Sequence, residues 1–106
     1  MSKKINLQDK ISAGSIILSG RDKGELLRSK LDLDKLEKET DVVTIVVPDS
    51  IVSFNSSYFL GLFTPSIIKY KSREEFLKKY TFECDEYILN DIEDGISEAL
   101  KKNNLL

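Results

Sequence analysis

The sequence contains no histidine, which removes the residue most often used as a general base and as a metal ligand. Catalytic arrangements of the Ser-His-Asp or Cys-His kind are therefore impossible. A single cysteine, Cys84, excludes an internal disulfide and a thiolate metal cluster. No convergent polar cluster replaces these groups, so we expect a protein that is not an enzyme and that needs no metal or cofactor.

Long hydrophobic runs and an excess of one charge are also missing. No apolar run reaches transmembrane length, and the N-terminal residues lack the apolar core of a signal peptide. The 16 basic and 18 acidic residues are mixed along the chain and leave a net charge of −2. Binding to nucleic acid or to an anionic membrane needs a basic stripe, so neither is expected. A cytoplasmic protein is the default expectation.

Strand character is found in four stretches, Ile5–Ile11, Ser15–Ser19, Val42–Val47 and Tyr80–Cys84. The third stretch is β-branched and apolar at nearly every position, which predicts a central strand covered on both faces. The first has a loose alternation of apolar and polar residues and is expected at a sheet edge, where it could pair with a second chain. Oligomeric state is left open by these patterns.

Helices are expected between the strands. Asp22 and Glu25 have capping-box spacing, so a helix is predicted from Lys23 to Leu31 with Asp22 as its cap. A helix from Ser56 is predicted to stop at Phe63, because Pro65 follows. Further helices are expected in Asp32–Glu39, after the Ser72 capping box, and at Asp85–Lys102. The segment Ser66–Tyr70 is compatible with either a strand or a helix. This alternation predicts one α/β domain, a small mixed β-sheet with helices packed largely on one side.

Two polar segments are candidates for function. S-G-R-D-K-G (Ser19–Gly24) combines glycines and cations before a helix, as a phosphate cradle does, but it lacks P-loop spacing and also suits a plain turn. In N-S-S-Y-F-L-G-L-F (Asn55–Phe63), Asn55 or Ser56 is a plausible N-cap. Ser57 would lie in the first helical turn, where a phosphate is tolerated. Capping alone and a phosphorylation switch both account for these residues.

The order of these motifs resembles a known family. V-V-T-I-V-V-P-D, then I-V-S-F, then N-S-S-Y-F-L-G-L-F resembles the centre of STAS domains, which are named for sulphate transporters and anti-sigma-factor antagonists. The chain looks more specifically like the STAS-like family of small prokaryotic proteins of unknown function. The similarity includes the arginine turn at Arg21, the pair Ser57-Tyr58 and the helix glycine Gly61, and it spans roughly Ile5 to Leu100.

This resemblance implies a STAS-like α/β fold and a protein partner. Anti-sigma-factor antagonists bind a histidine-kinase-like ATPase, which phosphorylates a serine in a D-S-[ST]-G-like motif. Asn55 falls at the aspartate of that motif, Ser56 at the phosphoacceptor, Ser57 at the next hydroxyl and Tyr58 at the glycine. Two of the four positions therefore differ from the motif. In the STAS-like family the retained hydroxyl matches Ser57 instead.

The leading hypothesis is a non-enzymatic interaction module in bacterial cytoplasmic regulation. It would dock a protein partner, such as a histidine-kinase-like ATPase, through Asn55–Phe63, with exposed Tyr58 or Phe59 as anchors and Arg21 nearby. The alternative is a small-ligand or nucleotide-binding domain that uses the helix N-termini at Asp22 and Ser56 as an anion site. An accessory role in phage defence or in a mobile element is a third hypothesis.

Overall fold

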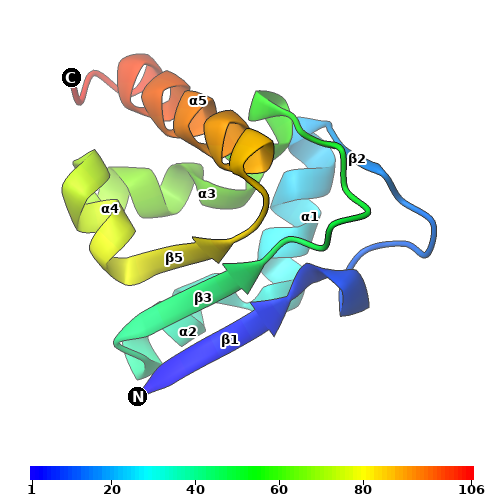
Figure 1. The fold of residues 1–106 in the computed structure, drawn as a ribbon. Helices are drawn as coiled ribbons and strands as arrows, with labels where there is room; N and C mark the ends of the chain where they lie inside the picture. Colours follow the sequence, from blue (N-terminus) through cyan, green and yellow to red (C-terminus); the bar gives the residue numbers. More distant parts are fainter.

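A computed structural model describes all residues from 1 to 106 and shows an α/β domain. Its main sheet contains β1 (Ser2–Asn6), β3 (Val42–Val46) and β5 (Tyr80–Glu83) in the order β1-β3-β5 (Figure 1). Two shorter strands, β2 (Ile17–Leu18) and β4 (Ser53–Phe54), form a separate pair, which we call the β2–β4 ribbon. The predicted α/β class is confirmed, and so is a first strand at the sheet edge. That strand runs over Ser2–Asn6 and not over Ile5–Ile11, because the chain turns into a 3-10 helix at Leu7–Asp9.

Every strand pair is parallel, so the expectation of a mixed sheet is wrong. The physical reason lies in the connections, because helices intervene between each pair of bonded strands. Parallel pairing needs such a long crossover, whereas an antiparallel pair can be joined by a tight turn. The sequence has no short hairpin turn between two of its strands.

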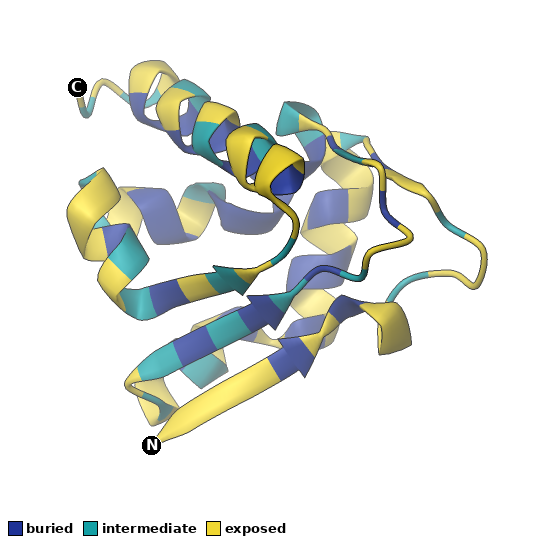
Figure 2. Ribbon diagram, in the orientation of Figure 1, coloured by how far each residue is buried: buried dark blue, intermediate teal, exposed yellow.

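Five α-helices pack against this framework, and the chain also makes one short 3-10 turn at Leu7–Asp9. They are α1 (Arg21–Leu31), α2 (Leu33–Glu39), α3 (Ser56–Tyr70), α4 (Arg73–Lys79) and α5 (Glu86–Lys102). Along β3, Val43 and Ile45 are buried while Val42, Thr44 and Val46 are only half-buried, as Figure 2 shows. The predicted central strand is therefore confirmed, but the expectation that both its faces are covered is wrong. No helix combines the length and the apolar composition that crossing a bilayer requires.

Two helix boundaries differ from the prediction. Helix α1 begins at Arg21, and its N-cap is Gly20 with φ of 95°, so Asp22 is not the cap. Positive φ is a conformation that glycine adopts without steric cost. Helix α3 continues through Pro65 to Tyr70, although proline removes one intrahelical hydrogen bond. The next residues, Ser66 and Ile67, are fully buried, so packing of that turn holds the helix together.

Other local signals are confirmed. The Glu75 amide donates to Ser72 Oγ at 3.1 Å, as the capping box predicts. Helix α5 buries the apolar residues that follow one another every four positions, Ile88, Ile92, Ile96 and Leu100. Asp85 is the residue before α5, although its side chain makes no capping hydrogen bond.

The core is organised around α3, which lies between α1 and α5. Aromatic rings from α3, α4 and β5 pack against one another, with centroids of Phe59 and Phe63 5.0 Å apart and those of Phe63 and Tyr80 also 5.0 Å apart. Gly95 of α5 makes room for this cluster, because a Cβ at that position would lie 2.5 Å from the Phe59 ring. The side chains of α3 are thus enclosed from two sides.

Helices α1 and α3 touch through their backbones. A Cβ added at Gly24 would lie 2.2 Å from the Tyr58 carbonyl oxygen, and one added at Gly61 would lie 2.1 Å from the Arg21 carbonyl oxygen. Both carbonyl oxygens belong to the backbone and cannot move aside as a flexible side chain could. The two glycines therefore set how closely the helices approach each other.

Replacing Gly24 with alanine is expected to destabilise the fold by at least about 2 kcal/mol, because the methyl group must push two helices apart. Alanine has a higher helix propensity than glycine, so the same substitution would stabilise an isolated helix. Ser29→Ala, at an exposed position of the same helix, is the matched control and should change stability little. Urea denaturation of both variants checks this, and a Gly24→Ala protein as stable as the control would contradict the close contact.

Candidate functional site

The start of α3 is held by a small hydrogen-bond system around Ser57. Asn55 is the N-cap, because its Oδ1 accepts from the Ser57 amide at 3.0 Å. The same Oδ1 accepts from the Ser57 hydroxyl at 2.9 Å, and Ser57 Oγ accepts from the Gly20 amide at 3.1 Å. The Ser57 hydroxyl therefore joins the N-termini of α1 and α3, and both of its roles as donor and acceptor are in use.

Backbone contacts attach the β2–β4 ribbon to this helix start. The Asn55 amide donates to the Leu18 carbonyl at 2.8 Å, and the Phe54 amide donates to Asp91 Oδ2 at 2.9 Å. Arg21 lies beside α3 at Gly61, while its exposed side chain is 3.7 Å from the Glu25 carboxylate. The structure thus brings Arg21, Asn55 and Ser57 into one region, although Arg21 is far from the other two in sequence.

Ser56 differs from its neighbour because its hydroxyl has no hydrogen-bond partner within the chain. It is half-buried and lines a hollow together with Asn55, Asp91 and Asp94. A phosphate on Ser56 would gain from the N-terminus of α3 but would face two carboxylates of α5. The Ser56 hydroxyl is therefore free to react or to bind a partner, whereas the Ser57 hydroxyl stabilises the fold.

Tyr58 and Phe59 are not the exposed anchors that the sequence suggests. Their side chains are buried, with 4% and 0% of the residue surface exposed, so that expectation is wrong. The physical reason is that α3 is enclosed by α1 on one side and α5 on the other. The run from Tyr58 to Phe63 is apolar at every position, which is typical of a helix that is buried all round.

The glycines of the Ser19–Gly24 turn are also occupied by the fold. Gly24 packs against the backbone of α3, and the Gly20 amide already donates to Ser57 Oγ. A phosphate cradle needs free backbone amides that point at the ligand. The alternative, a plain turn into a helix, accounts for this segment.

A buried polar network is centred on Glu37 of α2 and includes residues of α1, α3 and β5. Sequence patterns did not indicate it. The Glu37 carboxylate accepts from the Ser66 hydroxyl, from the Tyr80 hydroxyl and from Lys69 Nζ, the last at 3.1 Å. Arg28 Nη1 donates to Ser66 Oγ at 2.9 Å, and the Arg28 guanidinium lies 3.8 Å from the Glu37 carboxylate. Burial and the Glu37 carboxylate raise the pKa of Tyr80 far above its usual range, so its hydroxyl remains a donor.

This Glu37 network has its donors and acceptors paired within the chain. Arg28 also donates to the Leu62 carbonyl at 2.8 Å and to Asp34 at 2.8 Å. The contact with Arg28 keeps the pKa of the Asp34 carboxyl below its ordinary value. The network joins α1, α2, α3 and β5, and its buried members are paired with one another, so its role is structural.

The carboxyl ends of the three parallel strands are the place where many α/β proteins bind ligands. Here that edge is an open hollow whose charged residues are Asp49, Glu83 and Asp85. Cys84 is half-buried beside them, and burial, followed by the charge of Asp85, raises the pKa of its thiol. The thiol therefore stays protonated at neutral pH, which is typical of an unreactive cysteine.

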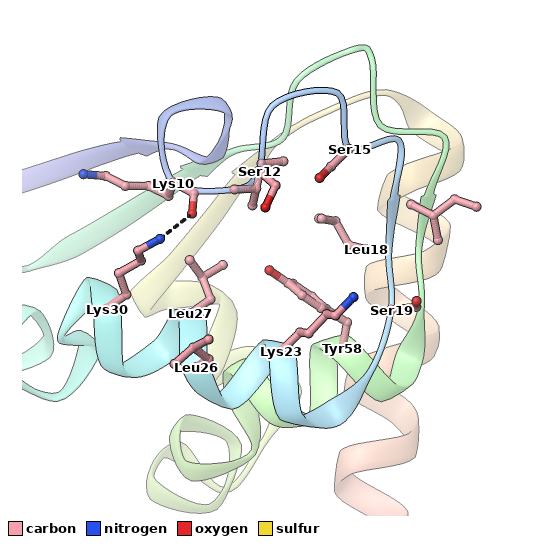
Figure 3. Close-up of a pocket in the computed structure, with 12 residues that line it drawn as sticks. Lys10, Ser12, Ser15, Leu18, Ser19, Lys23, Leu26, Leu27, Lys30 and Tyr58 are labelled. Carbon is pink, nitrogen blue, oxygen red and sulfur yellow. Dashed lines mark hydrogen bonds between the residues drawn. The ribbon is translucent and has the colours of Figure 1, made fainter.

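A second hollow lies over α1, on the side of the β2–β4 ribbon. It has a volume of about 270 Å³ and is lined by residues of α1, by the segment that leads into β2, and by Tyr58. In the close-up of Figure 3, the Lys23 amine and the Tyr58 hydroxyl point into this space, and Lys30 lies at its rim. We call it the lysine cleft.

Comparison with known proteins matched the chain to no protein-family model, no curated protein and no solved structure. The similarity to the STAS-like family therefore stays a prediction from the motifs of the sequence.

The Glu37 network predicts that Arg28→Leu is strongly destabilising, by about 3–5 kcal/mol, because it leaves a buried carboxylate without its guanidinium partner. Arg21→Leu is the matched control, since Arg21 lies on the same helix with an exposed side chain. The control should stay within about 0.5 kcal/mol of the original protein. Thermal and urea unfolding measure both, and equal stability of the two variants would contradict the network.

Ser57→Ala is expected to lower the free energy of unfolding by about 1–2 kcal/mol, because the Gly20 amide loses its acceptor and Asn55 loses a donor. Ser56→Ala should be nearly neutral, since the Ser56 hydroxyl has no partner in the chain. Comparing the urea midpoints of the two variants tests this assignment of roles. A larger effect at position 56 than at 57 would overturn it.

Proposed function

We propose that this chain is a non-enzymatic protein-interaction module that acts in bacterial cytoplasmic regulation. Its docking surface is the exposed part of the α3 start, Asn55 and Ser56, together with the adjoining aliphatic residues of the ribbon. The observation that carries the proposal is the exposure of Ile16, Ile17 and Val52, each at 54%. We call these three residues the aliphatic patch.

The aliphatic patch is assembled by the fold. The Val52 amide donates to the Ile16 carbonyl at 2.7 Å, and Ile17 pairs with Ser53 in the parallel ribbon. Leu26 of α1 is 70% exposed and lines the lysine cleft together with Ile17. Ile16 and Val52 directly precede the two strands of the ribbon, and Ile17 is the first residue of β2. Single exposed apolar residues are ordinary, but a group of large ones in neighbouring segments is typical of an interaction surface.

The identity of the partner is supported by the resemblance to anti-sigma-factor antagonists, which implies a histidine-kinase-like ATPase. The arrangement of the serines favours docking itself over a phosphorylation switch. Ser57 is engaged between α1 and α3, and Ser56 faces Asp91 and Asp94, which would repel an added phosphate. Docking through the aliphatic patch needs neither hydroxyl to be modified.

The alternative function is small-ligand binding. It was expected at the helix N-termini, but the lysine cleft supports it better. The amides of Gly20 and Ser57 at the two helix N-termini already have acceptors within the chain. The lysine cleft, in contrast, presents the Lys23 amine and the Tyr58 hydroxyl without partners in the chain, and it supports that alternative independently of any protein partner.

The docking proposal is tested by titrating purified histidine-kinase-like ATPases of the source organism against the full chain in a calorimeter. Ile16→Glu and Val52→Glu should weaken binding at least about tenfold, because each buries a charge in an apolar interface. Ile68→Glu is the matched control, since Ile68 is an exposed isoleucine at the far end of α3. It should leave the affinity unchanged.

Two results would count against this function. One is the absence of saturable binding to any such ATPase, and the other is equal binding by the patch variants and the Ile68 control. Intact-mass analysis after incubation with ATP shows in the same experiment whether Ser56 gains a phosphate. Modification of Ser56 with no effect on affinity would contradict its place in the docking surface.

A further inference from the structure

The lysine cleft combines an apolar floor with polar groups that converge from different elements. Leu18 of β2 and Leu27 of α1 form part of its lining, and both are buried. Lys23 and Lys30 come from the same face of α1, since seven residues make about two helical turns. Tyr58 reaches the space from α3, as Figure 3 shows.

The cationic groups of the cleft have no charge partner. Neither Lys23 nor Lys30 takes part in an ion pair, and no carboxylate is among the lining residues. The contact of Lys30 Nζ is a long one, 3.4 Å from the Lys10 carbonyl. Figure 3 shows that the side chain of Lys10 itself extends away from the cleft, so two amines serve this space.

Tyr58 provides a third polar group, from a different helix than the two lysines. The residue is only 4% exposed, yet its hydroxyl makes no hydrogen bond within the chain and points into the cleft (Figure 3). The hydroxyl oxygen is open to solvent through the cleft, so it is free to donate to a molecule that binds there. Burial also raises the pKa of Tyr58, which keeps the hydroxyl protonated and able to donate at neutral pH.

These groups define the chemistry of the ligand. Two ammonium groups can only donate hydrogen bonds, and the tyrosine hydroxyl is protonated, so the ligand must accept hydrogen bonds and carry negative charge. The two leucines favour an apolar portion beside that charge. The volume of about 270 Å³ lies just below the usual range of small-molecule sites, about 300–1,000 Å³, which favours a compact molecule over a dinucleotide.

We propose that the lysine cleft binds a small organic anion. Its acidic group, a carboxylate or a phosphate monoester, is held by Lys23, Lys30 and the Tyr58 hydroxyl, and its apolar body lies against Leu18 and Leu27. This site goes beyond protein docking, and its ligand is held by side chains and not by the backbone amides of a helix N-terminus.

The test is an NMR titration of the isotope-labelled full chain with four probes. Phenyl phosphate and benzoate carry a charge and a ring, benzyl alcohol has the ring without the charge, and inorganic phosphate has the charge without the ring. Phenyl phosphate or benzoate should shift the amide signals of residues 12–19 and 23–30 saturably. The other two probes should bind at least about tenfold more weakly, since each lacks one kind of contact.

Charge-neutralising variants locate the acidic group. Lys23→Gln and Lys30→Gln should each weaken the charged probe about tenfold, because each removes a charge-assisted hydrogen bond. Lys35→Gln is the matched control, an exposed lysine of α2 outside the cleft, and should bind as the original protein does. Tyr58→Phe should weaken binding severalfold while keeping the ring in place, and its amide spectrum shows whether the fold is intact.

The relative affinity of phenyl phosphate and benzoate identifies the preferred acidic group, and binding of either supports the site. The proposal is overturned if neither charged probe gives saturable shifts. It is also overturned if benzyl alcohol or inorganic phosphate binds as tightly, or if the two cleft variants retain the affinity of the Lys35 control. None of these results depends on a protein partner, so failure here and failure of docking are separate outcomes.

Discussion

The backbone contact between Gly24 and Gly61 is the constraint on which the functional parts of the molecule depend. With any side chain at either position, α1 and α3 could not approach as they do, because the opposing atoms are main-chain carbonyls and amides. The same approach brings the Gly20 amide to Ser57 Oγ and places the Arg21 turn beside α3. It also sets Lys23 of α1 next to Tyr58 of α3, so one close contact organises both the helix start and the lysine cleft.

Features that depend on neighbouring residues were predictable from the sequence. The Ser72 capping box, the Asn55 cap and the periodic face of α5 all arise from interactions within one or two helical turns. The β-branched stretch that forms β3 likewise has a strong intrinsic preference for extended backbone. In each case the local preference and the tertiary packing favour the same structure.

The errors occurred where tertiary contacts outweigh local preference. Pro65 should end a helix, but the burial of Ser66 and Ile67 stabilises the next turn of α3. Asp22 has the spacing of a cap, yet α1 starts earlier because Gly20 can take a positive φ at the point where β2 meets the helix. Whether β3 is buried on both faces depends on how the helices pack on the sheet. The residues of the strand alone do not determine that packing.

Pairing of polar groups separates the structural sites of this chain from the candidate binding site. Glu37, Arg28 and Ser57 each have a partner about 30 to 40 positions away, so their contacts stabilise the fold and leave no capacity for a ligand. The lysine cleft has the opposite property. The Lys23 amine and the Tyr58 hydroxyl have no partner in the chain, and no carboxylate lines the cleft. An anion there would accept from both groups and bring a negative charge to the lysines, which is why affinity is expected at this place in the fold.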